Sequence, residues 1–329
     1  MSPGPAGGAI LPRSPGMVPP RPPDRKAKAL QAQGYPGYRD LTRRAARATA
    51  YLAEMERHRL PGWIRVKQRM SKTLVSAWAD ISEGMARYRV WWSLAREDIG
   101  DQHRNTALGP AWFLINYLLH LGTFLAVFGQ SFEVRNYPAY VATGLLVWLY
   151  VSEVITRSTT MFRREEALIN GTTLPIMVYV MRLTTQSIIR SGYAFAGCIA
   201  VLILAGTPLS AAWFGSLLGI VLILLTTPAV AIVFAMLGAF FPDTQFIVNN
   251  LIRVGIFLTP VFWTHGAGLR GALYQYNPFT YYLQIVRQPI VEDTVPWTAL
   301  GICLVAGLLS WALAINLLGR LRKRIVFVL

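Results

Sequence analysis

The sequence predicts an all-α polytopic membrane protein, and three observations lead to this fold class. Of its 329 residues, 53% are hydrophobic, and the mean hydropathy is +0.39. Only 15% of the residues are charged, whereas soluble domains have about 25%. The apolar residues gather in six runs, each long enough to cross the hydrocarbon core as a helix of about 20 residues. These predicted spans cover residues 108–129, 138–157, 183–205, 212–240, 244–263 and 297–318.

The basic residues predict how the chain is oriented. There are 32 Lys and Arg against 16 Asp and Glu, a net charge of +16. Twenty-seven of the basic residues lie before the first span, between the second and third spans, or after the sixth, and three lie in the remaining loops. Since cytoplasmic loops carry an excess of Lys and Arg, we expect a multi-pass protein of the plasma (inner) membrane with both termini in the cytoplasm. The charge is therefore a topology signal, and no nucleic-acid partner is expected.

The region before the first span divides into three predicted segments. Residues 1–37 contain nine Pro and six Gly, which predicts a disordered tail. Residues 38–84 are basic and predict a cytoplasmic helical extension, interrupted at Pro61 and Gly62. Residues 85–105 combine Trp, Tyr and Arg with amphipathic spacing, so we expect a helix that lies in the plane of the membrane interface.

Two loops of the transmembrane domain, residues 108–329, are too long for tight turns. The polar segment 157–182 is expected to contain a short helix on the cytoplasmic side. The segment 265–296 is rich in aromatic residues but broken by Gly and Pro. It cannot span the bilayer as one helix, and we expect two short re-entrant helices.

The sequence lacks the motifs of the common enzyme classes. It contains no G-x-x-x-x-G-K-[ST] phosphate loop and no H-E-x-x-H or G-x-S-x-G. Its four His are scattered, so no metal site is indicated. We therefore expect no catalytic site and no cofactor in this chain. If the protein performs energy-driven work, the energy must be released in another chain.

Several motifs occur together in the second part of the chain. They are LGPAWFLIN at 108–116, YPAYVATGLLVWLYVSE at 137–153, FFPD at 240–243, Thr-Pro at 259–260 and NPFTYYLQIVR at 277–287. In this combination, residues 85–329 resemble the transmembrane permeases of ABC-2-type exporters, in the branch that exports O-antigen, capsule, teichoic acid or galactan precursors. The chain departs from that pattern at GDQHRNTALGP, residues 100–110, where relatives are more basic.

The resemblance implies partners and a substrate. Two copies of the chain would pair with two cytoplasmic ABC ATPase subunits, which bind ATP and Mg. The substrate would be a polyprenyl-diphosphate-linked polysaccharide, and membrane lipid would be a further partner. The segment 157–182 corresponds to the coupling helix that docks on the ATPase. The contact would be made by Arg163, Arg164, Glu165 and Glu166.

The predicted interfacial helix supplies candidates for a cytoplasmic gate. Its Arg side chains suit phosphate through paired donors, and its aromatic side chains would sit at headgroup level. The same residues would equally serve as an anchor on anionic lipid. The candidates are Tyr88, Arg89, Trp91, Trp92 and Arg96.

Three charged residues fall inside predicted spans, where an unpaired charge costs several kcal/mol. They are Glu153, Arg190 and Arg253. Glu153 can neutralise at most one of the two Arg. Either an Arg faces a polar conduit or a lipid diphosphate, or the pair is an internal brace or reaches the interface.

Aromatic residues in and near the outer halves of the spans could stack on sugar faces, because each has an apolar body and a polar tip. They could equally belong to the interfacial aromatic belt. These conduit candidates are Trp112, Tyr117, Tyr140, Trp148, Tyr274, Tyr276, Tyr281 and Tyr282.

Three other functions stay open at this level. One is an ABC-2 permease for a drug or a lipid, which the aromatic content disfavours only mildly. Another is a membrane enzyme acting on a polyprenyl-linked sugar, against which the scarcity of carboxylates in the transmembrane domain counts. The third is a secondary transporter, which usually shows internal repeats, and none is evident.

Overall fold

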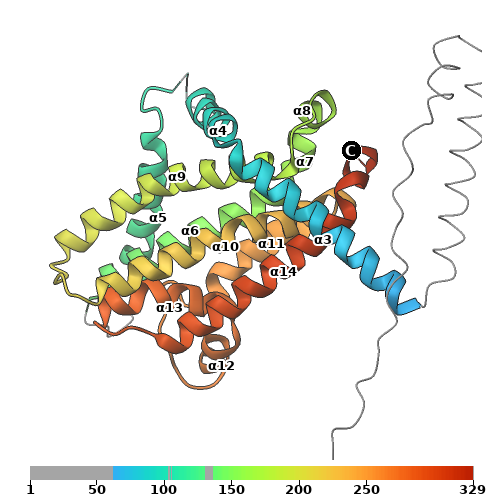
Figure 1. Ribbon diagram of the computed structural model, residues 1–329. Coiled ribbons are helices and arrows are strands. Elements are labelled where there is room, and N and C mark those ends of the chain that lie inside the picture. The colour runs from blue at the N-terminus through green and yellow to red at the C-terminus, as the bar shows by residue number, and fades with distance from the viewer. Residues whose placement is uncertain (1–61, 103, 105, 130–135, 329) are drawn as a thin grey trace, which may run out of the picture. The chain divides into compact units, whose positions relative to one another are not determined.

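The computed structural model describes residues 62–102, 104, 106–129 and 136–328. The chain divides into two compact units, residues 1–68 and 69–329, and every contact below lies within the second. The predicted tail and residues 38–61 of the basic extension lie outside the described residues. All regular structure in the described ranges is helical (Figure 1). The helices are α3 (Gly62–Ala86), α4 (Tyr88–Gln102), α5 (Ala111–Phe128), α6 (Tyr137–Thr159), α7 (Met161–Arg164), α8 (Glu166–Gly171), α9 (Ile176–Leu204), α10 (Trp213–Phe240), α11 (Thr244–Leu258), α12 (Leu269–Tyr276), α13 (Pro278–Val291) and α14 (Trp297–Val328).

Five of these helices are long and apolar enough to cross a membrane: α5, α6, α9, α10 and α14. They correspond to five of the six predicted spans. The sixth apolar helix, α11, has 15 residues and ends five residues before the predicted span does. Its end has a local cause, because the residue before a proline is disfavoured in helical geometry. Thr259 precedes Pro260 and is extended, with φ −101° and ψ 139°.

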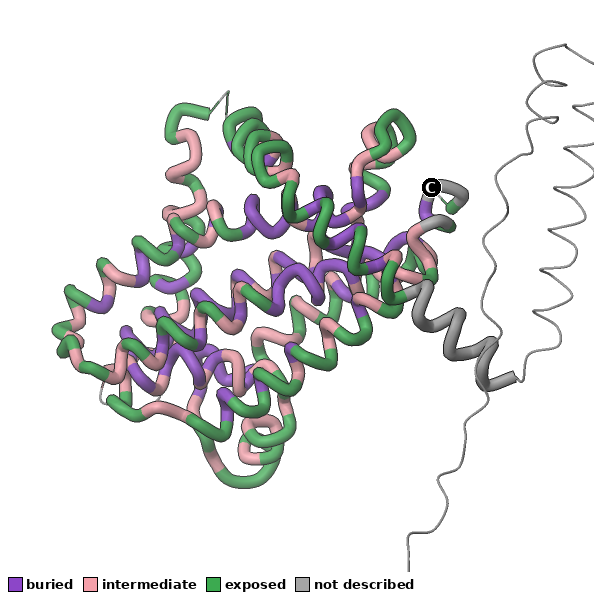
Figure 2. The backbone as a smooth tube through the Cα atoms, viewed as in Figure 1, coloured by how far each residue is buried: buried purple, intermediate pink, exposed green. Residues whose placement is uncertain are grey.

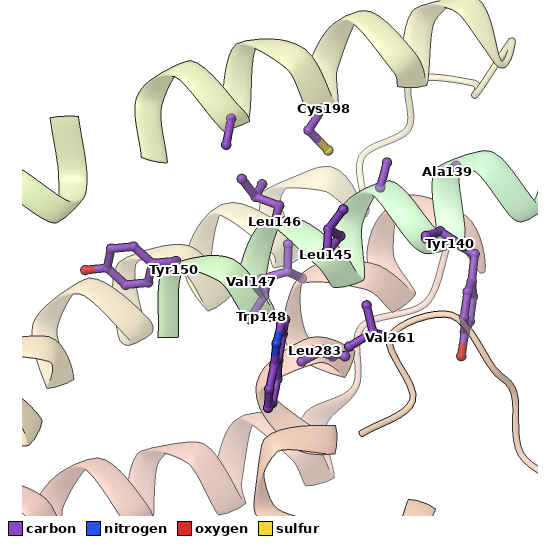
Figure 3. Packing of buried hydrophobic residues seen from close by; sticks show 14 of the residues in the cluster. Ala139, Tyr140, Leu145, Leu146, Val147, Trp148, Tyr150, Cys198, Val261 and Leu283 are labelled. Atoms are coloured by element: carbon purple, nitrogen blue, oxygen red, sulfur yellow. The ribbon is translucent and has the colours of Figure 1, made fainter. Parts of the chain in front are cut away.

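Helix α6 lies at the centre of the second unit. It packs against α5, α9, α10, α11 and α13, and its buried residues run from one end of the helix to the other (Figure 2). In the main core, Leu145 and Trp148 of α6 lie with Val261 and Leu283 (Figure 3). By contrast, α5, α11 and α14 expose much of their apolar surface, as lipid-facing helices do.

Two glycines allow contacts on α6 that a larger residue would block. A Cβ built on Gly238 of α10 would lie 1.8 Å from the carbonyl oxygen of Thr159, so the two backbones touch. A Cβ on Gly144 of α6 would lie 1.8 Å from Nη2 of Arg287. Small residues at helix crossings are a common device for close packing in membrane proteins.

The stretch predicted as one interfacial helix is divided between two helices. Helix α3 continues to Ala86, and α4 begins after a turn at Arg87. Helix α4 packs against α9 and buries Ala95 and Ile99 there. Packing on a neighbouring helix therefore uses the C-terminal part of the predicted apolar face.

Residues 259–263, between α11 and α12, are buried without forming a helix. Their carbonyl groups are bonded by side chains from distant elements. Tyr137 and Tyr140 donate hydrogen bonds to the carbonyls of Phe262 and Trp263, at 2.7 and 2.9 Å. The amide of Asn277 donates to the carbonyl of Leu258 at 3.1 Å.

Arg287 completes this arrangement from α13. Its Nη1 donates to the carbonyl of Pro260 at 2.7 Å and its Nη2 to that of Val261 at 3.1 Å. The guanidinium also lies 3.7 Å from the centre of the Tyr140 ring, and the residue is only 3% exposed. Arg287 falls in the segment 265–296, for which the sequence predicts two short re-entrant helices, and the structure places it in the core on α13.

Candidate functional site

A cavity of about 400 Å³ lies between α5, α6 and α9, with one residue from α11. Its wall is part apolar, formed by residues such as Phe113, Leu146 and Leu149. The rest of the wall carries polar and charged side chains. These are Asn116, Tyr117, Ser152, Glu153, Thr156, Arg157, Arg190 and Ser191.

Three charges meet at this wall. The Nε of Arg190 donates to Oε1 of Glu153, and the Nε of Arg157 lies 3.1 Å from the same oxygen. The side chain of Arg190 is 3% exposed, whereas those of Arg157 and Glu153 are 25% exposed. One carboxylate thus serves two guanidinium groups, and the cluster carries a net positive charge.

Arg190 keeps one donor unused. Its Nη2 is buried and has no hydrogen-bond partner among the described residues. A buried donor without a partner costs about 1–3 kcal/mol. A ligand that brings a hydrogen-bond acceptor to the polar wall would therefore remove the cost of burying this Arg190 nitrogen.

The structure separates the three predicted intramembrane charges. Glu153 and Arg190 lie together, while Arg253 is exposed on α11 and does not line the cavity. The partner that sequence reasoning missed is Arg157, which had been assigned to the loop. Its spacing of four residues from Glu153 on α6 was the available signal.

The segment formed by α7 and α8, residues 161–171, presents most of the predicted ATPase-contact residues. Arg163, Arg164 and Glu166 are exposed. Glu165 is turned inward, where Nη1 of Arg182 donates to its carboxylate at 2.5 Å. Burial raises the pKa of the Glu165 carboxyl, and the neighbouring Arg182 opposes that shift. Three of the four candidates are therefore free to meet a partner.

A second buried carboxylate lies at the start of α9. Asp80 of α3 accepts hydrogen bonds from the backbone N–H groups of Ile176 and Met177, at 3.3 and 3.1 Å. Arg322 of α14 lies 3.4 Å from the same carboxylate. Burial raises the pKa of Asp80, while these donors lower it. The carboxylate caps the N-terminus of α9 and ties three helices together, which sequence reasoning missed.

The predicted cytoplasmic gate residues do not line the cavity. Tyr88, Arg89, Trp92 and Arg96 are exposed on α4, and Trp91 is half-buried. The Nε of Arg89 donates to the hydroxyl of Tyr88 at 3.3 Å. This group forms a surface of its own on α4.

Of the eight conduit candidates, only Tyr117 borders the cavity. It is buried, and its hydroxyl donates to the carbonyl of Ala142 at 2.9 Å. Tyr140 and Trp148 belong to the core, and Trp148 meets Phe279 edge to face.

The other conduit candidates lie elsewhere. Trp112 is exposed on α5 and Tyr276 on α12. Tyr274, Tyr281 and Tyr282 are half-buried on α12 and α13. The structure therefore does not bring the eight aromatic residues together on one surface.

Comparisons with known proteins agree with this architecture. The model of a family described as ABC-2 type transporter matches residues 88–291, which begin with α4 and end with α13. The O-antigen export system permease protein RfbA of Myxococcus xanthus is 24% identical over 234 residues, covering 67% of this chain and 88% of the relative. Two proteins of the same name from Klebsiella pneumoniae are 22% and 21% identical, each covering 72% of this chain and 93% of the relative. Because the family match spans more than half of the sequence and includes the cavity and the α7–α8 segment, the chain belongs to the ABC-2 type transporter family.

Proposed function

We propose that the chain is the transmembrane permease subunit of an ATP-driven exporter. Its substrate is a polyprenyl-diphosphate-linked polysaccharide of the O-antigen, galactan or teichoic-acid type, moved from the cytoplasm across the plasma membrane. The observation that carries this proposal is the likeness to three O-antigen export permeases along 88–93% of their length.

The proposed topology has six membrane crossings, with α11 as the fifth. Fifteen helical residues extend roughly 22 Å at 1.5 Å per residue, less than the hydrocarbon thickness of about 30 Å. The buried residues 259–263 complete this crossing, because their carbonyls are bonded within the protein. Helix α4 lies at the cytoplasmic interface, and α12 and α13 re-enter from outside.

The proposed energy source is a pair of cytoplasmic ATPase subunits that bind ATP and Mg. Two copies of this chain assemble with them and place their termini on the same side. The exposed Arg163, Arg164 and Glu166 support a contact through the α7–α8 segment. The internal bond from Arg182 to Glu165 supports transmission from that contact into α9.

The test is reconstitution of the chain with its ATPase in proteoliposomes that contain a polyprenyl-diphosphate-linked glycan. We expect ATP-dependent transfer of the glycan to the far leaflet, and none with a hydrolysis-deficient ATPase. If a drug or simple lipid is transferred while the glycan is not, the chain is a permease for small amphiphiles instead. If no ATPase associates with the purified chain, the proposal of an ATP-driven exporter fails.

A further inference from the structure

We propose that the cavity between α5, α6 and α9 binds the phosphate groups of an amphiphile through Arg157 and Arg190. Identifying that amphiphile as a polyprenyl diphosphate rests on the function proposed above. The anion site itself follows from the charges, the burial and the unused donor at the cavity wall.

The first argument is the charge of the wall. Arg157 and Arg190 share a single carboxylate, that of Glu153. Glu153 is the only acidic residue among those that line the cavity. A second anion would offset this excess positive charge in a place where charge is costly.

The second argument is the unused donor of Arg190. The side chain is held by its Nε–H bond to Glu153, so its orientation is fixed before any ligand arrives. Its Nη2 remains without a partner among the described residues. A phosphate oxygen is the acceptor that an Arg fork fits best, and such charge-assisted bonds are about twice as strong as neutral ones.

The side chain of Arg157 is less enclosed than that of Arg190. Its side chain is 25% exposed, and it borders both the cavity and a small neighbouring space beside Glu165 and Arg182. It can turn from Glu153 toward an anion with little loss of packing. The site therefore combines one fixed guanidinium with one movable guanidinium, next to the α7–α8 segment.

The size and lining of the cavity restrict the ligand. Its volume of about 400 Å³ lies in the range of small-molecule pockets, about 300–1,000 Å³. It accommodates a diphosphate headgroup but not a sugar polymer. Phe113, Leu146 and Leu149 supply apolar surface for the first isoprene unit, so a phosphate joined to a hydrocarbon fits better than a free ion.

In this proposal, the Glu153 carboxylate competes with the ligand for the two guanidinium groups. The Glu153 carboxylate contacts both Arg residues at the cavity wall. Replacing it by Gln removes the competing charge while keeping a hydrogen-bond acceptor. Anion binding should then become tighter, whereas a brace would lose stability without gaining any affinity.

The experiment is titration of the purified full chain in detergent with farnesyl diphosphate, farnesol and inorganic pyrophosphate, followed by calorimetry. We expect farnesyl diphosphate to bind, farnesol to bind at least tenfold more weakly, and pyrophosphate to compete. Arg157→Gln should weaken binding of farnesyl diphosphate at least tenfold, and Glu153→Gln should strengthen it severalfold. The matched control is Arg320→Gln, an exposed position on α14, which should leave the affinity unchanged.

Arg190→Gln should abolish binding, and a thermal melt decides whether that variant is folded. If it is not, the conclusion rests on Arg157→Gln and Glu153→Gln. Equal affinity for farnesyl diphosphate in wild type, Arg157→Gln and Glu153→Gln would overturn the site, as would no binding to the wild type. These measurements need neither ATPase nor glycan. A chain that binds the diphosphate but exports no glycan therefore refutes the proposed function alone, and one that exports glycan without depending on Arg157 refutes the site alone.

Discussion

Arg182 of α9 holds Asp98 of α4 through two parallel hydrogen bonds, from Nε to Oδ2 at 2.6 Å and from Nη2 to Oδ1 at 2.7 Å. The guanidinium side chain is 14% exposed and the carboxylate side chain 31%. The remaining nitrogen of the same guanidinium bonds Glu165. One side chain thus connects the amphipathic helix α4, the long helix α9 and the α7–α8 segment.

Replacing Asp98 by Ala should loosen α4 from α9. Bonds to charged groups contribute about 1.5–3 kcal/mol each in favourable cases. Because the Asp98 side chain is 31% exposed, we expect a smaller total loss of about 1–3 kcal/mol in the docking of α4. Hydrogen exchange of the α4 amides measures the change. The control is Glu97→Ala, an exposed neighbour on the same helix. Equal exchange in the two variants would show that the pair does not hold α4.

The α7–α8 segment offers a contrast between outward and inward charges. The double variant Arg163→Ala, Glu166→Ala should weaken association with the ATPase by tenfold or more, without lowering the melting temperature, because both side chains are exposed. Pull-down of the ATPase and a thermal melt measure the two effects.

Glu165→Ala is the matched comparison and should give a different pattern. It removes an acceptor of Arg182 and should lower the melting temperature, while leaving Arg163 and Glu166 in place for the ATPase. If the double variant associates with the ATPase as well as wild type does, the segment is not the contact.

Arg287→Met should destabilise the protein more than any exposed Arg variant. The carbonyls of Pro260 and Val261 would lose their donors, at about 1–3 kcal/mol for each buried unsatisfied group. Tyr137→Phe removes the hydrogen bond from the Tyr137 hydroxyl to the Phe262 carbonyl and should cost about 1 kcal/mol. Thermal unfolding in detergent ranks the variants, with Arg253→Met as the exposed control. A melting temperature of Arg287→Met equal to that of the control would show that the Arg287 hydrogen bonds to the Pro260 and Val261 carbonyls do not stabilise the protein.

Gly238→Ala should prevent normal packing of α10 on α6. The added Cβ would meet the Thr159 carbonyl oxygen at 1.8 Å, and a backbone atom cannot move aside as a flexible side chain does. Gly301→Ala in α14 meets nothing within 4 Å and should be neutral or slightly stabilising, since Ala favours a helix over Gly by about 1 kcal/mol. Yield of monodisperse protein compares the two. Similar yields would show that the helices separate easily.

The predictable part of the fold is the part that hydropathy controls. Helix α10 was expected at 212–240 and occurs at Trp213–Phe240, because a continuous apolar run in lipid has to be helical. Hydropathy cannot tell a helix from a buried irregular stretch, and for this reason the predicted span 244–263 continued past Leu258. The break depends on Pro260 and on donors that come from 120 or more residues earlier in the sequence.

The candidate site was predictable only in part. Glu153 and Arg190 stood out because charges are rare in spans, and they do meet. The addition of Arg157 and the exclusion of Arg253 depend on which faces of α6, α9 and α11 turn toward each other. The buried position of Arg287 could not be predicted from the sequence, because its partners are carbonyl oxygens, which every residue has.

The irregular stretch between α11 and α12 sets a mechanical limit on the protein. The carbonyl groups of residues 258–263 all accept hydrogen bonds. The donors are the side chains of Tyr137, Tyr140, Asn277 and Arg287 and one local backbone amide. Pulling α13 or the start of α6 away would strand several acceptors at once, each costing about 1–3 kcal/mol. These three elements therefore travel as a single rigid block. A conformational change that moves this block has to bend the chain at the edge of the block rather than within it. Gly268, with a φ of +66°, lies at such an edge, just before α12.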